Sequence, residues 1–406
     1  MSKLCRLLDD FEPSVKEIGA LALASIVKHH PSLACDLVKL GALPQLIQSI
    51  QEPELAIKAA SSQCIAEIVS HSTEMAHVAV DCGAILVLSK CLELNDPRPK
   101  RSALNALACI AKHSVDLAES IVSAEIYPSA MLLLRDVDEI VRRNTMILTK
   151  EICKQSQDLA QLMTSIGVIG ATLSYLKGSP LSTGSIAESQ NSLQCHAQIP
   201  ALLTLGYLAA QSDTISLCLI RDKVVELLDQ VLRDTKDSKL LCTAIWTLSQ
   251  ICQHSAEHSK SIASIPGAFE NILSFVSPNS ADKSELSEKA ARCLRLIIQK
   301  CTYLPALEPL LVITASRPHS EILASILVQF SKVLPVEAVY RKSFVTSGCL
   351  KVIQEMQVVG SGDDAGSGLA ESVVRINECF PPEIVKYYSP GYSEVLLERV
   401  DQFTIN

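Results

Sequence analysis

The feature that most constrains this chain is a motif that recurs every 42 residues. Four similar strings, IVKHHPSLA, IVSHSTEMA, IAKHSVDLA and ICKQSQDLA, each open on an isoleucine, namely Ile26, Ile68, Ile110 and Ile152. The register continues with spacings of 56, 43 and 46 residues at Leu208, Ile251 and Ile297. A chain that repeats itself in this way builds one unit several times and packs each unit against its neighbours.

Within each unit the apolar residues follow the spacing of an α-helix. A glycine lies 15 residues after the isoleucine in three units, where a helix is expected to end, at Gly41, Gly83 and Gly167. A period of roughly 40–47 residues with helical spacing is typical of HEAT and armadillo arrays. We therefore expect an all-α fold, a right-handed superhelical solenoid of armadillo repeats with a period of about 42 residues. Because such repeats share one core, we also expect Leu132→Asp to unfold several adjacent repeats together.

The expected solenoid covers residues 1–358 and begins with an incomplete repeat. The string LCRLLDDFEP matches the second helix of a unit whose first helix is missing, so the chain is either truncated here or covered by a partner. The Ser- and Gly-rich residues 177–198 are interpreted as an insertion loop. Residues 359–369 (VGSGDDAGSGL) resemble a flexible linker, and residues 370–406 are interpreted as a C-terminal helical cap or docking segment.

Two charged positions share the period. Acids recur at the expected start of the longest helix, at Glu12, Glu54, Asp96 and Asp138. Bases follow four residues later, at Lys16, Lys58, Lys100 and Arg142. An acid–base pair with this spacing and order stabilises a helix by roughly 0.2–0.5 kcal/mol, and this ion-paired helix start is the simpler interpretation. Together with Arg98, Arg101 and Arg143, the bases also form a stripe that could bind an acidic partner, such as the glutamate-rich tails of tubulin.

No constellation for catalysis or metal binding emerges. His254 and His258 have a spacing that metal ligands can use, but the sequence places no third ligand beside them. The net charge of −8 argues against general nucleic-acid binding. No apolar run approaches the roughly 18 residues of a membrane span. We predict a protein that is not an enzyme, uses no cofactor or small-molecule substrate, and binds neither nucleic acid nor a membrane.

The C-terminal segment is unusually aromatic. Residues 380–406 contain Phe380, Tyr387, Tyr388, Tyr392 and Phe403, in a chain with only 4% aromatic residues. Aromatic burial serves a packed cap and a docking surface equally well. Both interpretations therefore stay open, with Tyr387, Tyr388 and Tyr392 as candidate partner-binding residues.

The string ALPQLIQSI followed by SSQCIAEIV resembles the armadillo pattern of a Pro-containing helix and a long Ala-rich helix. Importin-type armadillo proteins carry Trp and Asn four residues apart on that long helix, to grip basic peptides. Among the corresponding pairs of this chain, only Trp246 with Gln250 contains the tryptophan, and glutamine takes the place of the asparagine there. The resemblance therefore argues against a nuclear-import adaptor and leaves Trp246 and Gln250 as a candidate binding pair.

A more specific resemblance lies in the last third, in KCTYLPALEPLL (300–311), QFSKVLP (329–335), FVTSGCLK (344–351) and PPEIVKYYSPGYSEVLLERVDQF (381–403). These strings are similar to the sperm-associated antigen 6 family, armadillo proteins of the ciliary and flagellar central apparatus. Two departures are a shortened N-terminal region and the insertion at 177–198.

The resemblance implies a non-enzymatic scaffold of the axonemal central apparatus. Such a scaffold would support assembly or stability of the central microtubule pair, ciliary and flagellar motility, and sperm motility. Its partners would be axonemal microtubules and central-apparatus proteins, in the cytoplasm, the cytoskeleton and the axoneme of the cilium or flagellum. The alternative is a cytosolic armadillo adaptor that binds an extended peptide of a signalling partner.

Overall fold

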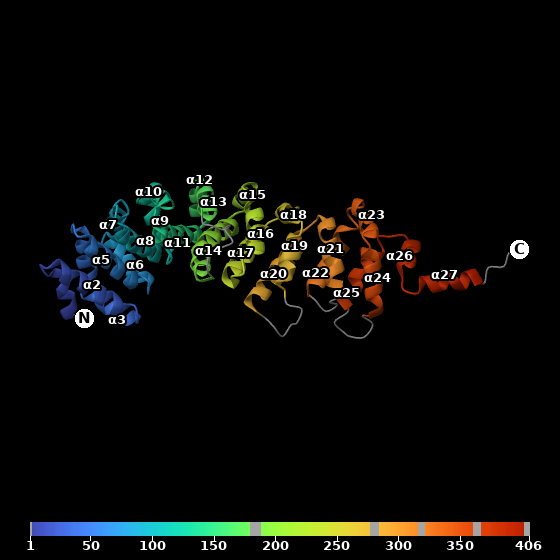
Figure 1. Cartoon of the computed structure of the whole chain (residues 1–406), viewed down its shortest axis with the longest axis horizontal. Coiled ribbons are helices and arrows are strands. Elements are labelled where there is room, and N and C mark those ends of the chain that lie inside the picture. The colour runs from blue at the N-terminus through green and yellow to red at the C-terminus, as the bar shows by residue number, and fades with distance from the viewer. Residues whose placement is uncertain (1, 179–187, 277–283, 316–320, 360–366, 402–406) are drawn as a thin grey trace. The chain divides into compact units, whose positions relative to one another are not determined.

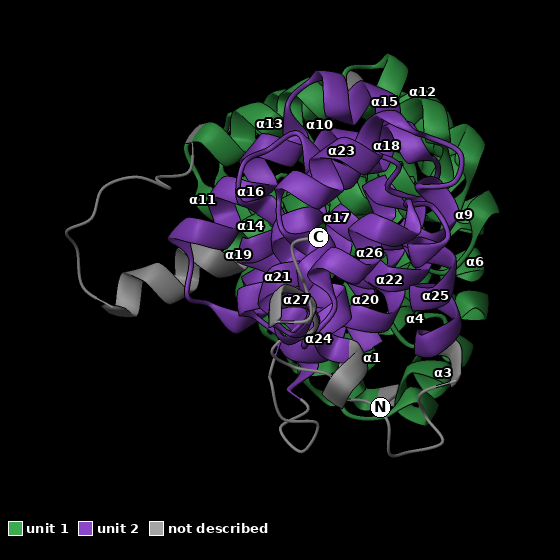
Figure 2. Ribbon diagram, turned by 90° about the vertical axis from the view of Figure 1, so that its right-hand side faces the viewer, with its two compact units in different colours: residues 1–215 green, residues 216–406 purple. Residues whose placement is uncertain are grey.

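The computed structural model describes residues 2–178, 188–276, 284–315, 321–359 and 367–401. Throughout these ranges the chain forms helices joined by short turns, and they contain no strand. The helices group into two compact units, residues 1–215 and 216–406, coloured separately in Figure 2.

Unit 1 repeats a set of one long helix and two shorter ones. The long helices are α2 (Pro13–Val27), α5 (Leu55–Val69), α8 (Pro97–Ala111), α11 (Glu139–Gln155) and α14 (Glu188–Gln211). The first shorter helix of each set is α3 (Pro31–Lys39), α6 (Thr73–Asp81), α9 (Val115–Ser123) or α12 (Gln157–Ser165). The second is α4 (Ala42–Gln51), α7 (Ala84–Leu92), α10 (Ile126–Leu133) or α13 (Val168–Gly178). The unit opens with α1 (Ser2–Cys5) and a 3-10 helix, η1 (Arg6–Asp9), and α15 (Asp213–Arg221) contains the boundary with unit 2.

The core of unit 1 lies between consecutive long helices. Each long helix from α2 to α14 packs against the next one, and α4, α7 and α10 form a second row in the same order. Figure 1 shows this succession from blue to green. One position of the long helix carries Cys64, Ala106 and Leu148, all without exposed surface. The period of the sequence is therefore the period of this packing.

Unit 2 has the same organisation with less regular helices. Its first elements are α16 (Val224–Asp234), α17 (Ser238–Cys252), α18 (Ala256–Ala263), α19 (Ala268–Ser274), α20 (Glu285–Lys300) and the 3-10 helix η2 (Leu304–Ala306). They are followed by α21 (Glu308–Ala315), α22 (Glu321–Val333), α23 (Val339–Thr346), α24 (Cys349–Val359), α25 (Ser367–Asn377), α26 (Pro382–Tyr388) and α27 (Tyr392–Asp401). α17, α20, α22 and α25 pack in succession, as the long helices of unit 1 do.

The insertion-loop prediction is wrong for residues 188–198, which form the first part of α14. The helix is anchored there, because the Tyr175 hydroxyl donates to the Ala197 carbonyl at 3.0 Å and Ala197 is buried. Residues 188–199 contain neither Pro nor Gly, so the Ser/Gly-rich composition of the segment misled over this part. Residues 177–178 end α13, and residues 179–187 lie outside the described ranges.

The predicted boundary at residue 358 is also wrong. α25 packs against α22 as the next long helix of the array, and Phe380 beyond it stacks on Phe344 with ring centroids 5.8 Å apart. The apolar positions Leu369, Val373 and Ile376 have helical spacing, and Val373 and Ile376 are buried. The glycines before them concealed this stripe in the sequence. Of the predicted linker, residues 360–366 lie outside the described ranges.

Leu132 is not in the core as predicted. Its side chain is 71% exposed on α10, whereas Leu133 and Leu134 beside it are buried. In a run of three leucines the helical period alone does not fix which one faces inward.

Candidate interaction surface

The recurring acids lie at the N-caps of the long helices α2, α5, α8 and α11, as predicted. The Asp96 carboxylate accepts a hydrogen bond from the Arg98 backbone N–H at 2.8 Å, and Asp138 accepts one from Val141 at 2.9 Å. Glu12 and Glu54 make no such side-chain bond. The shorter Asp side chain is the better cap, in line with the general preference at this position.

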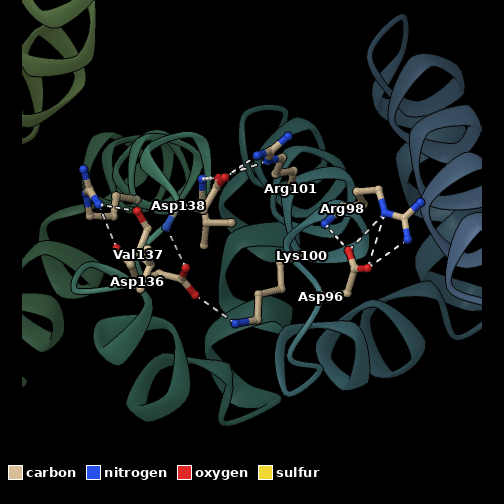
Figure 3. Close-up of polar contacts among 9 residues, drawn as sticks. Asp96, Arg98, Lys100, Arg101, Asp136, Val137 and Asp138 are labelled. Atoms are coloured by element: carbon tan, nitrogen blue, oxygen red, sulfur yellow. Dashed lines mark hydrogen bonds and ion pairs between the residues drawn. The ribbon is translucent and has the colours of Figure 1, made fainter.

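The predicted ion pairs four residues apart are wrong. Lys16 Nζ instead binds Glu52 at 2.6 Å, and Lys100 Nζ binds Asp136 at 2.8 Å. Each acid lies 36 residues after its lysine, in the turn that leads into the next long helix. Figure 3 shows this arrangement for Lys100 and Asp136. Side chains on an α-helix lean toward its N-terminus, so a base in the first turn points out of its own helix and toward the neighbouring turn.

The other two recurring bases bind backbone carbonyls. Lys58 Nζ donates to the Ile50 carbonyl at 2.6 Å, and Arg142 Nη1 donates to the carbonyls of Asp136 and Val137. The register explains the difference for Lys58, because the residue 36 positions further on is Leu94 and offers no carboxylate. Carbonyls near a helix C-terminus lack helical partners, so a cation satisfies them.

Arg101 joins the same junction from the neighbouring position. Its guanidinium makes a two-pronged ion pair with Asp138, the N-cap of the following long helix (Figure 3). This hydrogen bonding lowers the pKa of the Asp138 carboxyl. Burial alone would raise the pKa of Asp136, but hydrogen bonds from Lys100 and from the Asp138 N–H outweigh it and leave that pKa lowered. Both acids are therefore held in the charged form.

The four recurring bases therefore mostly bind acids or carbonyls within and between repeats, and they do not form a stripe of unpaired charges. The Lys16 and Lys100 side chains are only 16% and 12% exposed. Arg143 is different, since it lies on the exposed side of α11 and forms no ion pair with a described residue. Partner binding by any of these bases stays a prediction, and Arg143 is the base best placed for it.

A second series of ties was missed in the sequence. The side chain that ends each long helix donates to a carbonyl at the end of the preceding one. His71 Nε2 donates to the Val27 carbonyl at 2.8 Å, and Gln155 Nε2 donates to the Ala111 carbonyl at 2.7 Å. His113 to Val69 and Gln211 to Lys154 repeat the arrangement. The His or Gln recurs with the period of the sequence, but its carbonyl partner lies on the neighbouring repeat, which spacing along one helix does not reveal.

Trp246 and Gln250 lie one turn apart on α17, and both are partly buried. The Gln250 side-chain oxygen accepts a hydrogen bond from Gln253 Nε2 at 3.0 Å. The pair therefore shares one helix face, as its spacing predicted.

The C-terminal aromatic residues that the structure describes divide into two groups, and Phe403 lies outside the described ranges. Phe380 is buried against Phe344 and belongs to the packed end of the array. Tyr387 forms edge-on contacts with Tyr388 and Tyr392, at centroid distances of 5.0 and 5.8 Å, and is 61% exposed. The tyrosine cluster on α26 and α27 therefore offers aromatic surface, which favours the docking interpretation for these three residues.

The described ranges contain no group of three or more His, Cys, Asp or Glu side chains arranged to hold a metal. The rings of His254 and His258 lie 5.5 Å apart without a third ligand from these ranges. No single described helix is long and apolar enough to cross a membrane; two bent helix pairs, Thr73–Asp81 with Ala84–Leu92 and Gln157–Ser165 with Val168–Lys177, meet the length and composition test only together.

Solved structures with a similar backbone include an engineered protein and a designed armadillo repeat protein. An engineered protein aligns with 93% of this chain and 98% of its own, at a TM-score of 0.56 and 19% identity. A computationally designed armadillo repeat protein for modular peptide recognition aligns with 61% of this chain and 98% of its own, at a TM-score of 0.52 and 16% identity. This likeness shows the fold, an all-α armadillo solenoid.

No protein-family model matches the sequence. Sperm-associated antigen 6 of mouse and that of human are each 42% identical to this chain over 173 residues. The match covers 42% of the chain and 32% of either relative, so the chain spans about a third of the length of these curated relatives. Over this 173-residue region, the chain is similar to sperm-associated antigen 6.

Proposed function

We propose that this chain is a non-enzymatic scaffold of the axonemal central apparatus, which supports assembly or stability of the central microtubule pair and thereby ciliary and sperm motility. The observation that carries the proposal is the 42% identity to sperm-associated antigen 6 over 173 residues. Its partners would be axonemal microtubules and central-apparatus proteins, and its location the axoneme within the cytoskeleton. An array of repeats offers such partners extended surfaces.

The contacts within unit 1 support a rigid scaffold in that unit. The α2–α5 and α8–α11 junctions combine buried apolar faces with a tie near each end of the long helix, such as Lys100 to Asp136 and Gln155 to Ala111 at α8–α11. A partner that spans several repeats would meet surfaces whose spacing is fixed. For the docking itself we propose Arg143 and the tyrosine cluster of Tyr387, Tyr388 and Tyr392.

Fractionation of tagged protein from ciliated cells tests this function. Detergent extraction followed by a salt series should leave the protein with the axoneme until high salt, because contacts spread over many repeats are lost only together. The variant Arg143→Glu should elute at lower salt than Arg221→Glu, a matched change at an exposed arginine of unit 2. Release of the unaltered protein into the detergent-soluble fraction would refute an axonemal scaffold.

A peptide-binding adaptor remains the second candidate. Gln63 and Asn105 occupy the same position on α5 and α8, and both side chains are exposed. Exposed amides at a repeat spacing can hydrogen-bond the backbone of an extended peptide. This function predicts micromolar or tighter binding of a linear peptide that is lost on Trp246→Ala, measured on a peptide array and then by calorimetry. Equal binding by the variant would contradict the role of Trp246.

A further inference from the structure

Unit 2 contains a pocket of about 470 Å³ near the C-terminal ends of α22 and α25, lined by Ser331, Pro335, Arg341, Arg375, Glu378 and Cys379. Pockets that bind small groups in proteins span roughly 300–1,000 Å³, so the volume is sufficient for more than one side chain. We propose that this pocket binds the carboxylates of an acidic peptide segment from a partner protein. This site goes beyond the proposed axonemal role and does not depend on it.

The first support is a guanidinium that is held in place without being neutralised. Arg341 Nε donates to the Leu334 carbonyl at 3.0 Å, and its Nη2 donates to the Pro335 carbonyl at 2.9 Å. Both acceptors are uncharged, and no described carboxylate forms an ion pair with Arg341. A guanidinium has five donors in a planar fork, so Arg341 keeps donors for a ligand while its orientation is fixed.

The second support is the neighbouring charge. Arg375, in the last turn of α25, is exposed and forms no ion pair with any residue in the described ranges. Lys332 and Lys342 are exposed beside the pocket residues Ser331 and Arg341. Together with Arg341 these groups carry four positive charges, against the two acids of the same stretch, Glu337 and Glu378. The local surplus is therefore two positive charges in a chain whose net charge is −8.

The negative charge of the whole chain does not override this local surplus. At physiological salt the screening length is about 8 Å, so charges elsewhere on the array act weakly on a ligand held by two arginines. Burial raises the pKa of the Cys379 thiol in the same pocket; the Arg341 charge opposes this rise, and the Glu378 charge adds to it.

The residues that follow Pro335 specify the partner further. Val336 and Val339, one and four residues after it, are each 81% exposed. Exposed apolar side chains next to paired arginines suit a peptide that places an apolar residue beside its acids. Guanidinium groups bind carboxylates through two parallel hydrogen bonds, which makes a carboxylate ligand more specific than a general anion.

Fluorescence anisotropy of the full chain at physiological salt tests this inference. The probe is a fluorescein-labelled hexaglutamate peptide, and a hexaglutamine peptide with the same label is its control. We expect hexaglutamate alone to bind, and Arg375→Glu to weaken that binding roughly tenfold or more. Arg375→Lys keeps the charge without the two-pronged geometry, so its affinity should fall between the two.

The matched variant is Arg221→Glu, whose side chain is 82% exposed in the same unit and remote in sequence from the pocket. It should bind hexaglutamate as the unaltered chain does. Absence of hexaglutamate binding, equal binding of hexaglutamine, or an equal loss in Arg221→Glu and Arg375→Glu would each overturn the proposal. Circular dichroism of Arg375→Glu, expected to match that of the unaltered chain, separates lost binding from lost folding.

Discussion

Glu125 occupies a backbone conformation that glycine holds in neighbouring repeats. Its φ is 52°, and the equivalent Gly41 and Gly83 have φ of 77° and 84°. The left-handed conformation costs a residue with a Cβ roughly 1–2 kcal/mol, while glycine loses about 0.5–1 kcal/mol of chain entropy on folding. Because the Glu125 side chain is exposed, we predict that Glu125→Gly raises the free energy of unfolding of unit 1 by about 0.5–1 kcal/mol. Urea titration followed by hydrogen exchange measures this, and Gly83→Ala should show the opposite sign.

His113 makes the stability of its repeat depend on pH. Burial is the main cause that lowers the pKa of His113, and the nearby Lys112 charge adds to it, against the hydrogen bond to the Val69 carbonyl. The folded chain therefore favours the neutral ring. The stabilisation is complete above the unfolded pKa, near 6.5, and is lost as the pH falls from there through the lower folded pKa.

Glutamine makes the same tie at residue 155 without titrating, so we predict that His113→Gln retains the stability of unit 1 at pH 7.5. It should also reduce the stability loss between about pH 6.5 and 5, in which His113 takes part. Urea midpoints across this range measure the effect. Identical slopes in both proteins would contradict the titration of His113 as a cause.

At the scale of elements, the sequence predicts what local spacing determines. The isoleucines that recur every 42 residues place the long helices. Ser72, Ser114 and Ser156 cap α6, α9 and α12, and each hydroxyl accepts a hydrogen bond from a backbone N–H. The partner of Lys100 could not be predicted in the same way. It depends on the distance across a turn to Asp136, which only the packed repeats define. The pocket around Arg341 and Arg375 was missed for that reason too, since its walls come from three separate helices and the turns after them.

The Lys100–Asp136 tie should couple neighbouring repeats measurably. The two side chains are 12% and 16% exposed, so water screens the pair less than a surface pair. We predict a coupling energy of about 1–2 kcal/mol in a double-mutant cycle with Lys100→Met and Asp136→Asn. The Arg98–Asp96 pair, whose arginine is 61% exposed, is the control and should give a smaller coupling energy. Equal values for the two cycles would show that the tie between repeats has no special role.

At the scale of the whole molecule, stability should follow the packing of long helices. Leu148 on α11 is fully buried, and α11 packs against both α8 and α14. An aspartate there would place an unpaired charge between repeats, at a cost of about 4 kcal/mol or more. Because each repeat is stable only through its neighbours, we predict that Leu148→Asp removes hydrogen-exchange protection from α8, α11 and α14 together. Leu132→Asp, at a 71% exposed leucine of the same unit, should leave that protection in place. Loss confined to α11 would mean that the repeats unfold one by one, and that the array is a chain of independent units instead of a cooperative scaffold.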